Sequence, residues 1–134
     1  KKAKDNFKKY LITPEQEFVE AHSFLAIIEN KEIPSLKSLK VSKESYVLGL
    51  LDCIGELKRL VLDNVRKDRL KEANRIFNVM ENLYLVLYPL AMYDKIVKEA
   101  RRKLDVNRVL VEETRAVITE EIRRNHFINA LAEK

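Results

Sequence analysis

The sequence predicts an all-α fold, an antiparallel bundle of long helices joined by short connections. Only two glycines and three prolines occur in 134 residues, so the chain lacks the turn clusters that an all-β protein needs. Apolar residues recur at helical spacing through several long stretches. No repeat, low-complexity segment or domain boundary interrupts them, and we therefore predict a single domain over residues 1–134.

Two helical segments are predicted before residue 30. Residues 1–11 have the pattern of the end of a helix. A new helix is expected to start at Thr13, which can cap it, with Pro14 in the first helical position and Gln16 completing a capping box. It should end near Asn30. Its expected apolar stripe consists of Phe18, Ala21, Leu25 and Ile28.

A second stripe on the same helix contains Phe24 and Ile27. Two acids, Glu17 and Glu20, extend this stripe toward the N-terminus. Because they are in line with apolar residues, we expect both acids to be partly buried.

A single long amphipathic pattern covers residues 41–69 and follows a connection over residues 30–40. Ser42 is expected to cap this helix, which should end near Lys67. Both glycines of the chain, Gly49 and Gly55, lie in its interior, where each costs about 1 kcal/mol relative to alanine. We therefore predict that another backbone, a ligand or an ion approaches the helix closely there.

Two further helices complete the predicted bundle. Asp68 can cap the third helix, which Pro89 should end. Asp94 can cap the last helix, which should run past Arg124. The core positions of the third helix are Leu70, Ala73, Phe77, Met80, Tyr84 and Leu87.

The charge and cysteine content limit the setting of the protein. A formal net charge of +5 suits an anionic partner, above all a nucleic acid. The single cysteine, Cys53, cannot form an internal disulfide, which favours a reducing, cytoplasmic setting and a buried packing role. No apolar run approaches the length of a membrane span, so no membrane association is expected.

Two pairs of acids are candidates for a metal site. Glu17 and Glu20 are three residues apart, and Asp52 and Glu56 are four apart, so each pair shares a helix face. If neighbouring helices bring the pairs together, the ligands are oxygen only and suit Mg²⁺ or Mn²⁺ rather than zinc. Without a cation, two such charges about 4 Å apart repel by roughly 4 kcal/mol at an effective dielectric of 20. The alternative is that these are ordinary surface acids on separate faces, which a chain with 35% charged residues produces often.

Basic residues form a second candidate site. Arg101, Arg108 and Arg115 are spaced by seven and lie nearly along one stripe, where they can contact phosphates. Equally, Asp105 and Glu112 can neutralise the stripe through surface ion pairs. A second basic cluster follows the acid pair of the long helix and consists of Lys58, Arg59, Arg66, Lys67 and Arg69.

Other residues with binding chemistry fit packing roles better. Tyr84, Tyr88 and Tyr93 can stack on bases, but core or subunit contacts are the commoner use of such tyrosines. His22 and His126 are expected to be surface or packing residues rather than metal ligands.

Two segments resemble the translin and translin-associated factor X family. They are EFVEA at residues 17–21 and YVLGLLDCIGELKR at residues 46–59, and the last predicted helix agrees through RRKLDV at residues 101–106. The resemblance covers about residues 13–119. It is closest to the catalytic translin-associated factor X kind, in its archaeal form, because acids occupy all four motif positions. The helix that opens family members is expected to be missing or truncated here.

The resemblance implies a metal-dependent endoribonuclease that cleaves single-stranded RNA, can also bind single-stranded DNA, and works as a closed homo-oligomer, expected to be an octamer. Its catalytic and metal-binding residues, for Mg²⁺ or Mn²⁺, would be Glu17, Glu20, Asp52 and Glu56. Its nucleic-acid-binding residues would be Arg59, Arg101, Arg102, Arg108 and Arg115. Two alternatives stay open, a non-catalytic module that binds single-stranded nucleic acid and a helical scaffold for assembly.

Overall fold

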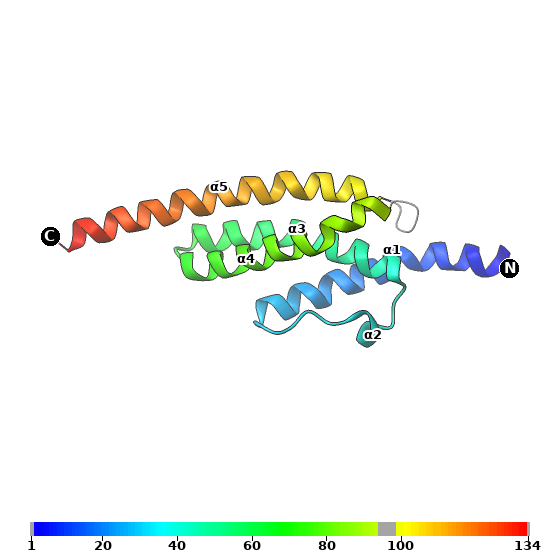
Figure 1. Ribbon diagram of the computed structural model, residues 1–134. Helices are drawn as coiled ribbons and strands as arrows, with labels where there is room; N and C mark the ends of the chain where they lie inside the picture. Colours follow the sequence, from blue (N-terminus) through cyan, green and yellow to red (C-terminus); the bar gives the residue numbers. More distant parts are fainter. Residues whose placement is uncertain (1, 94–98, 134) are drawn as a thin grey trace.

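The computed structural model describes the backbone of residues 2–93 and 99–133, and the side chains of residues 11–90 and 99–133. All regular secondary structure in these ranges is helical, which confirms the predicted all-α class (Figure 1). The elements are α1 (Lys2–Ile28), α2 (Leu36–Leu39), α3 (Lys43–Arg66), α4 (Leu70–Leu87), the 3-10 helix η1 (Tyr88–Tyr93) and α5 (Ala100–Ala132). None of the described helices is long and apolar enough to cross a membrane.

Helix α3 is the centre of the bundle and packs against α1, α4 and α5. It runs antiparallel to α4, and α4 runs antiparallel to α5 (Figure 1). Helix α1 instead runs in the same direction as α3, because the connection that contains α2 returns along the bundle before α3 begins (Figure 1). Ser42 caps α3, as predicted, by accepting a hydrogen bond from the backbone N–H of Ser45 at 3.1 Å.

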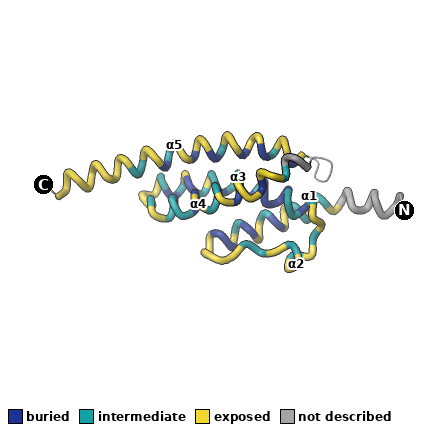
Figure 2. The backbone as a smooth tube through the Cα atoms, viewed as in Figure 1, coloured by how far each residue is buried: buried dark blue, intermediate teal, exposed yellow. Residues whose placement is uncertain are grey.

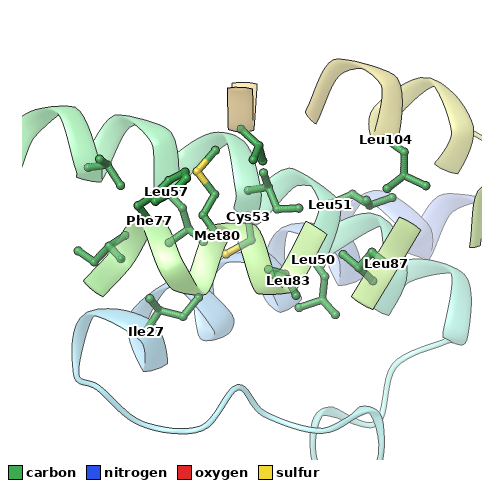
Figure 3. Close-up of a cluster of buried hydrophobic side chains, with 14 of the residues drawn as sticks. Ile27, Leu50, Leu51, Cys53, Leu57, Phe77, Met80, Leu83, Leu87 and Leu104 are labelled. Carbon is green, nitrogen blue, oxygen red and sulfur yellow. The ribbon is translucent and has the colours of Figure 1, made fainter. Parts of the chain in front are cut away.

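The hydrophobic core lies where α3 meets α4 (Figure 3). Leu51 and Leu57 of α3 are at most 1% exposed, and Met80 of α4 is fully buried beside them. The free thiol of Cys53 is also fully buried, as the predicted packing role requires.

The predicted helix start at Thr13 is wrong, because α1 is continuous from Lys2 to Ile28 and contains Pro14 in its interior. Proline cannot donate the backbone hydrogen bond to residue 10, but Pro14 is exposed and its ring disturbs no neighbouring helix. Gln16 does not complete a capping box either, since its side chain bonds to Asp52 of α3.

The buried face of α1 is not the stripe of Phe18, Ala21, Leu25 and Ile28 that the sequence predicts. Phe18 and Leu25 are 45% and 52% exposed. The side chains that face α3 and the core are Val19, Ser23, Ala26 and Ile27, with Phe24 partly buried beside them. Small residues at positions 23 and 26 let the helices approach closely, so the neighbouring stripe with Ile27 is the one that is buried.

Close approach explains only one of the two glycines. A Cβ atom on Gly49 would lie 2.6 Å from Val19 Cβ and 2.7 Å from the backbone oxygen of Gln16, so α1 confirms the prediction there. A Cβ on Gly55 would meet only Leu110 Cδ1, at an ordinary 3.9 Å. Within the described chain, no backbone approach requires glycine at position 55.

The remaining predicted helix ends are partly correct. Asp68 is not the cap of α4, because the N-cap residue is Arg69 and Asp68 adopts a left-handed conformation with φ of 59°. Helix α4 ends at Leu87, before Pro89, as predicted. Asp94 lies outside the described residues, and α5 begins at Ala100 after Glu99.

Helix α5 runs past Arg124, as predicted, and ends at Ala132. Its C-terminal part extends beyond the other helices and is exposed (Figure 2).

Candidate functional site

Helices α1 and α3 bring the two predicted acid pairs together. Because the helices run in the same direction, later residues of α1 contact later residues of α3. Glu15 accepts a hydrogen bond from Ser45 Oγ at 2.8 Å, and one residue further along α1 the Gln16 amide donates to Asp52 Oδ2. On the next turn of α1, Glu20 lies beside the acids of α3.

Three of the four acids line one cavity. Glu17 and Glu20 from α1 and Glu56 from α3 line an open space of about 380 Å³, together with Ala21 and Phe24. Glu20 is partly buried, as predicted, but Glu17 is exposed, because it lies further toward the solvent side of α1. The pair on α1 and one acid of the pair on α3 therefore face a common opening.

The acids influence one another's ionisation. Partial burial raises the pKa of the Glu20 carboxyl above 4.5, and the negative charges of Asp52, Glu56 and Glu17 raise it further. The Lys103 ammonium opposes this rise in the pKa of Glu20.

Cys53 lies within reach of the same charges. Its burial, and then the charges of Glu20, Glu56 and Asp52, raise the pKa of its thiol to about 12. Its thiol is therefore protonated at neutral pH.

Asp52 is set apart from the three glutamates by its partners. Lys103 Nζ of α5 lies 2.5 Å from Asp52 Oδ1, and Gln16 Nε2 of α1 donates to Oδ2. The Asp52 side chain lines a second cavity, of about 240 Å³, between α3 and α5, with Gly55 and Arg102 among the other lining residues.

Neither Gln16 nor Lys103 was predicted as a site residue. Gln16 occupies a capping-box position and Lys103 belongs to a basic run, so the sequence carries no local signal that both reach Asp52.

The donor chemistry of the cluster suits a hard cation. All four acids present oxygen, which Mg²⁺ and Mn²⁺ prefer. As the side chains are placed, the described part of the chain contains no group of three or more His, Cys, Asp or Glu residues that could hold a metal ion. The donor types therefore fit these cations, while the positions of the side chains leave the acids divided between two cavities.

Two of the predicted nucleic-acid-binding arginines, Arg59 and Arg102, lie on the same side of the bundle as the carboxylates. Arg59 is exposed and follows Asp52 by seven residues and Glu56 by three, which places it on the same face of α3. Arg102 lines the cavity beside Asp52 and forms an ion pair with Glu99 at 3.5 Å.

The other three arginines follow the opposite flank of α5. Arg115 pairs with Glu81 of α4, and the charge of Arg108 acts on Tyr84 of α4. Arg101 is on the same stripe, since positions spaced by seven share a helix face. The stripe of Arg101, Arg108 and Arg115 thus borders α4, whereas the carboxylates border α3 and α1.

The predicted aromatic and histidine contacts lie away from the acids. Tyr84 is partly buried, with its ring 5.9 Å from that of the exposed Tyr88, and the side chain of Tyr93 is outside the described residues. His22 is exposed, and its ring lies tilted against that of Phe18 with the ring centroids 4.2 Å apart. His126 is exposed on the projecting part of α5.

Comparison with known proteins agrees with this architecture. The Translin family model matches residues 4–118. An uncharacterized protein of Methanocaldococcus jannaschii is 46% identical over 109 residues, which are 81% of this chain and 49% of that protein. The solved structure of AfC3PO in complex with duplex RNA aligns with a TM-score of 0.73 and 31% identity, covering 82% of this chain and 58% of that chain.

The chain spans about half the length of its curated relative and less than two thirds of the solved structure. The family model nevertheless covers most of the chain, including both acid pairs and the N-terminal half of α5. The chain therefore belongs to the Translin family.

Proposed function

We propose that this chain is a metal-dependent endoribonuclease that binds and cleaves single-stranded RNA, of the catalytic translin-associated factor X kind. The observation that carries the proposal is the common cavity of Glu17, Glu20 and Glu56, with Asp52 one helical turn from Glu56. Burial first, and then the charges of Asp52, Glu56 and Glu17, raise the pKa of the Glu20 carboxyl, so its charged form is costly without a cation.

In this proposal the four acids bind Mg²⁺ or Mn²⁺. When bound, such ions would supply Lewis-acid polarisation of the phosphodiester and would lower the pKa of water. The carboxylates hold and orient the cations. Arg59 and Arg102, on the same side, bind backbone phosphates and offset the repulsion between RNA and the acids.

The RNA ligand is supported by the family and by the structural neighbour. AfC3PO was solved in complex with duplex RNA, so both single-stranded and duplex RNA need to be tested on this chain. Binding of single-stranded DNA is part of the same proposal, since phosphate contacts do not distinguish the two polymers.

A homo-oligomer, expected to be a closed octamer, is the second part of the proposal. Phe18, Leu25 and Ile28 form an exposed apolar stripe on α1 that contacts between copies would cover. Assembly would also give a role to the arginines that border α4, which do not line the acid cavity of their own chain.

The decisive experiment is cleavage of labelled oligoribonucleotides, single-stranded and duplex, with Mg²⁺, with Mn²⁺ and with a chelator. We expect metal-dependent cleavage that falls at least about a hundredfold in Glu20→Gln. Glu32→Gln, an exposed acid outside the cluster, is the control and should cleave normally. Cleavage by Glu20→Gln at the wild-type rate would exclude the assigned site.

A second candidate function is RNA binding without cleavage. The observation in its favour is that Asp52 is already bound by Lys103 and Gln16 rather than grouped with the glutamates. In that case RNA affinity would be unchanged by chelator and by Glu20→Gln, and no cleavage product would form with either metal.

A further inference from the structure

The four acids of the proposed metal site are divided three to one. Glu17, Glu20 and Glu56 line the cavity between α1 and α3, whereas Asp52 lines the cavity between α3 and α5. Asp52 and Glu56 share one face of α3, one helical turn apart. The difference lies in the contacts of the Asp52 side chain.

Two donors hold that side chain, one on each oxygen. Lys103 Nζ is 2.5 Å from Oδ1, and the Gln16 amide donates to Oδ2. The ion pair is largely shielded, since the Lys103 and Asp52 side chains are only 20% and 28% exposed. A divalent cation bound to the same carboxylate would lie close to the Lys103 ammonium, and the two positive charges would repel strongly.

The chemistry of the two donors makes Lys103 the one that must yield. An uncharged amide can stay on its oxygen when a cation binds the carboxylate. A lysine ammonium is a point charge on a flexible stem, which can leave without breaking the helix that carries it.

We propose that Lys103 is a resident counter-ion of Asp52 that holds this carboxylate apart from Glu17, Glu20 and Glu56, and that a divalent cation must displace it to gather the four acids. This inference rests on the proposed metal-dependent function. Lys103 is in this sense a positioning residue, because it acts through Asp52.

The chain contains a matched control for this ion pair. Lys58 of α3 pairs with Glu113 of α5, so it bridges the same two helices. The Lys58 side chain is 24% exposed, close to the value for Lys103, but its partner lies outside the acid cluster. Replacing either lysine removes one positive charge and one ion pair between α3 and α5.

The test is the affinity for Mn²⁺ in the absence of RNA, measured by isothermal titration calorimetry on the whole protein. Lys103→Met should bind Mn²⁺ on the order of threefold to tenfold more tightly than the wild type, because no ion pair has to be broken first. Lys103→Gln should behave in the same way and guards against a folding defect specific to methionine. Lys103→Arg, which keeps the charge, and Lys58→Met should stay within about twofold of the wild type.

Three outcomes would overturn the proposal in distinguishable ways. Unchanged or weaker Mn²⁺ binding by both Lys103→Met and Lys103→Gln would mean that Lys103 does not compete with the cation. Equal tightening by Lys58→Met would mean that net charge alone is responsible. If neither the wild type nor any variant binds Mn²⁺, the metal-dependent function itself fails, whatever the role of Lys103.

Discussion

The carboxyl group of Glu20 is partly buried and lies near three other negatively charged carboxylates. Burial is the larger cause of its raised pKa, and the charges of Asp52, Glu56 and Glu17 follow. A folded-state pKa above the ordinary 4.5 means that the folded protein binds the proton of Glu20 more tightly than the unfolded chain does. The free energy of unfolding must then fall as the pH rises from 4.5 through the raised value.

Glu20→Gln removes this dependence. In chelator at pH 7 we expect the variant to melt a few degrees higher than the wild type, and the difference should shrink as the pH falls toward 4.5. Thermal unfolding followed by circular dichroism across this pH range measures it. A difference that does not change with pH would show that the ionisation of Glu20 is not its cause.

With added Mn²⁺, the wild type should melt at a higher temperature than Glu20→Gln. A ligand that binds only the folded state stabilises it by about 2.7 kcal/mol at a hundred times its dissociation constant. The wild type would gain this stabilisation and Glu20→Gln would lose most of it.

Helix α3 contains two glycines. Each is about equally unfavourable for helix formation relative to alanine, but their surroundings differ. Gly49 is needed because the backbone of α1 lies against it. That contact sets the register of α1 on α3 and so places Glu20 beside Glu56. Gly55 faces the cavity that Asp52 lines, where a methyl group would find room.

Alanine at these positions should therefore act in opposite directions. Gly49→Ala should lower the free energy of unfolding by about 1–3 kcal/mol, because its Cβ overlaps Val19 and the Gln16 backbone. Gly55→Ala should raise it by up to about 1 kcal/mol through helix propensity. Urea denaturation measures both changes, and equal destabilisation by both variants would contradict this account.

Gly55→Ala also tests whether a ligand or an ion approaches α3 at Gly55, where no other part of the described chain comes close enough to require glycine. If RNA or a cation approaches α3 at Gly55, the more stable variant should bind labelled RNA more weakly than the wild type. Unchanged RNA affinity would leave the glycine without a ligand role.

At the scale of the whole molecule, large apolar side chains are exposed on several helices of the described chain, including α1 and α5. Phe18, Leu25 and Ile28 form an exposed stripe on α1, and Phe127, Ile128 and Leu131 are exposed on the projecting end of α5. Such surfaces are typical of contacts between subunits.

Leu25→Glu should reduce the assembled mass measured by light scattering, because it places a charge on the α1 stripe. Asn78→Glu, at an exposed polar position of α4, is the control and should leave the mass unchanged. A wild type that is monomeric at micromolar concentration, or a Leu25→Glu variant of wild-type mass, would contradict the proposed oligomer.

The sequence by itself determined the properties that depend on neighbours along the helix. The helical class, the Ser42 cap of α3 and the placement of each acid pair on one face follow from composition, capping chemistry and the 3.6-residue period. Two helix starts predicted from the sequence are wrong. Pro14 lies inside α1 rather than at the start of a helix, and Arg69 rather than Asp68 is the N-cap residue of α4.

Only the tertiary structure decided how the helices are rotated against one another. Two adjacent stripes of α1 are both apolar, and packing at Gly49 selected the one that contains Ile27. The same packing placed Glu17, Glu20 and Glu56 around one cavity and gave Asp52 its partners on α1 and α5. Local periodicity defines which residues share a face, but which face meets which helix depends on contacts between residues distant in the sequence.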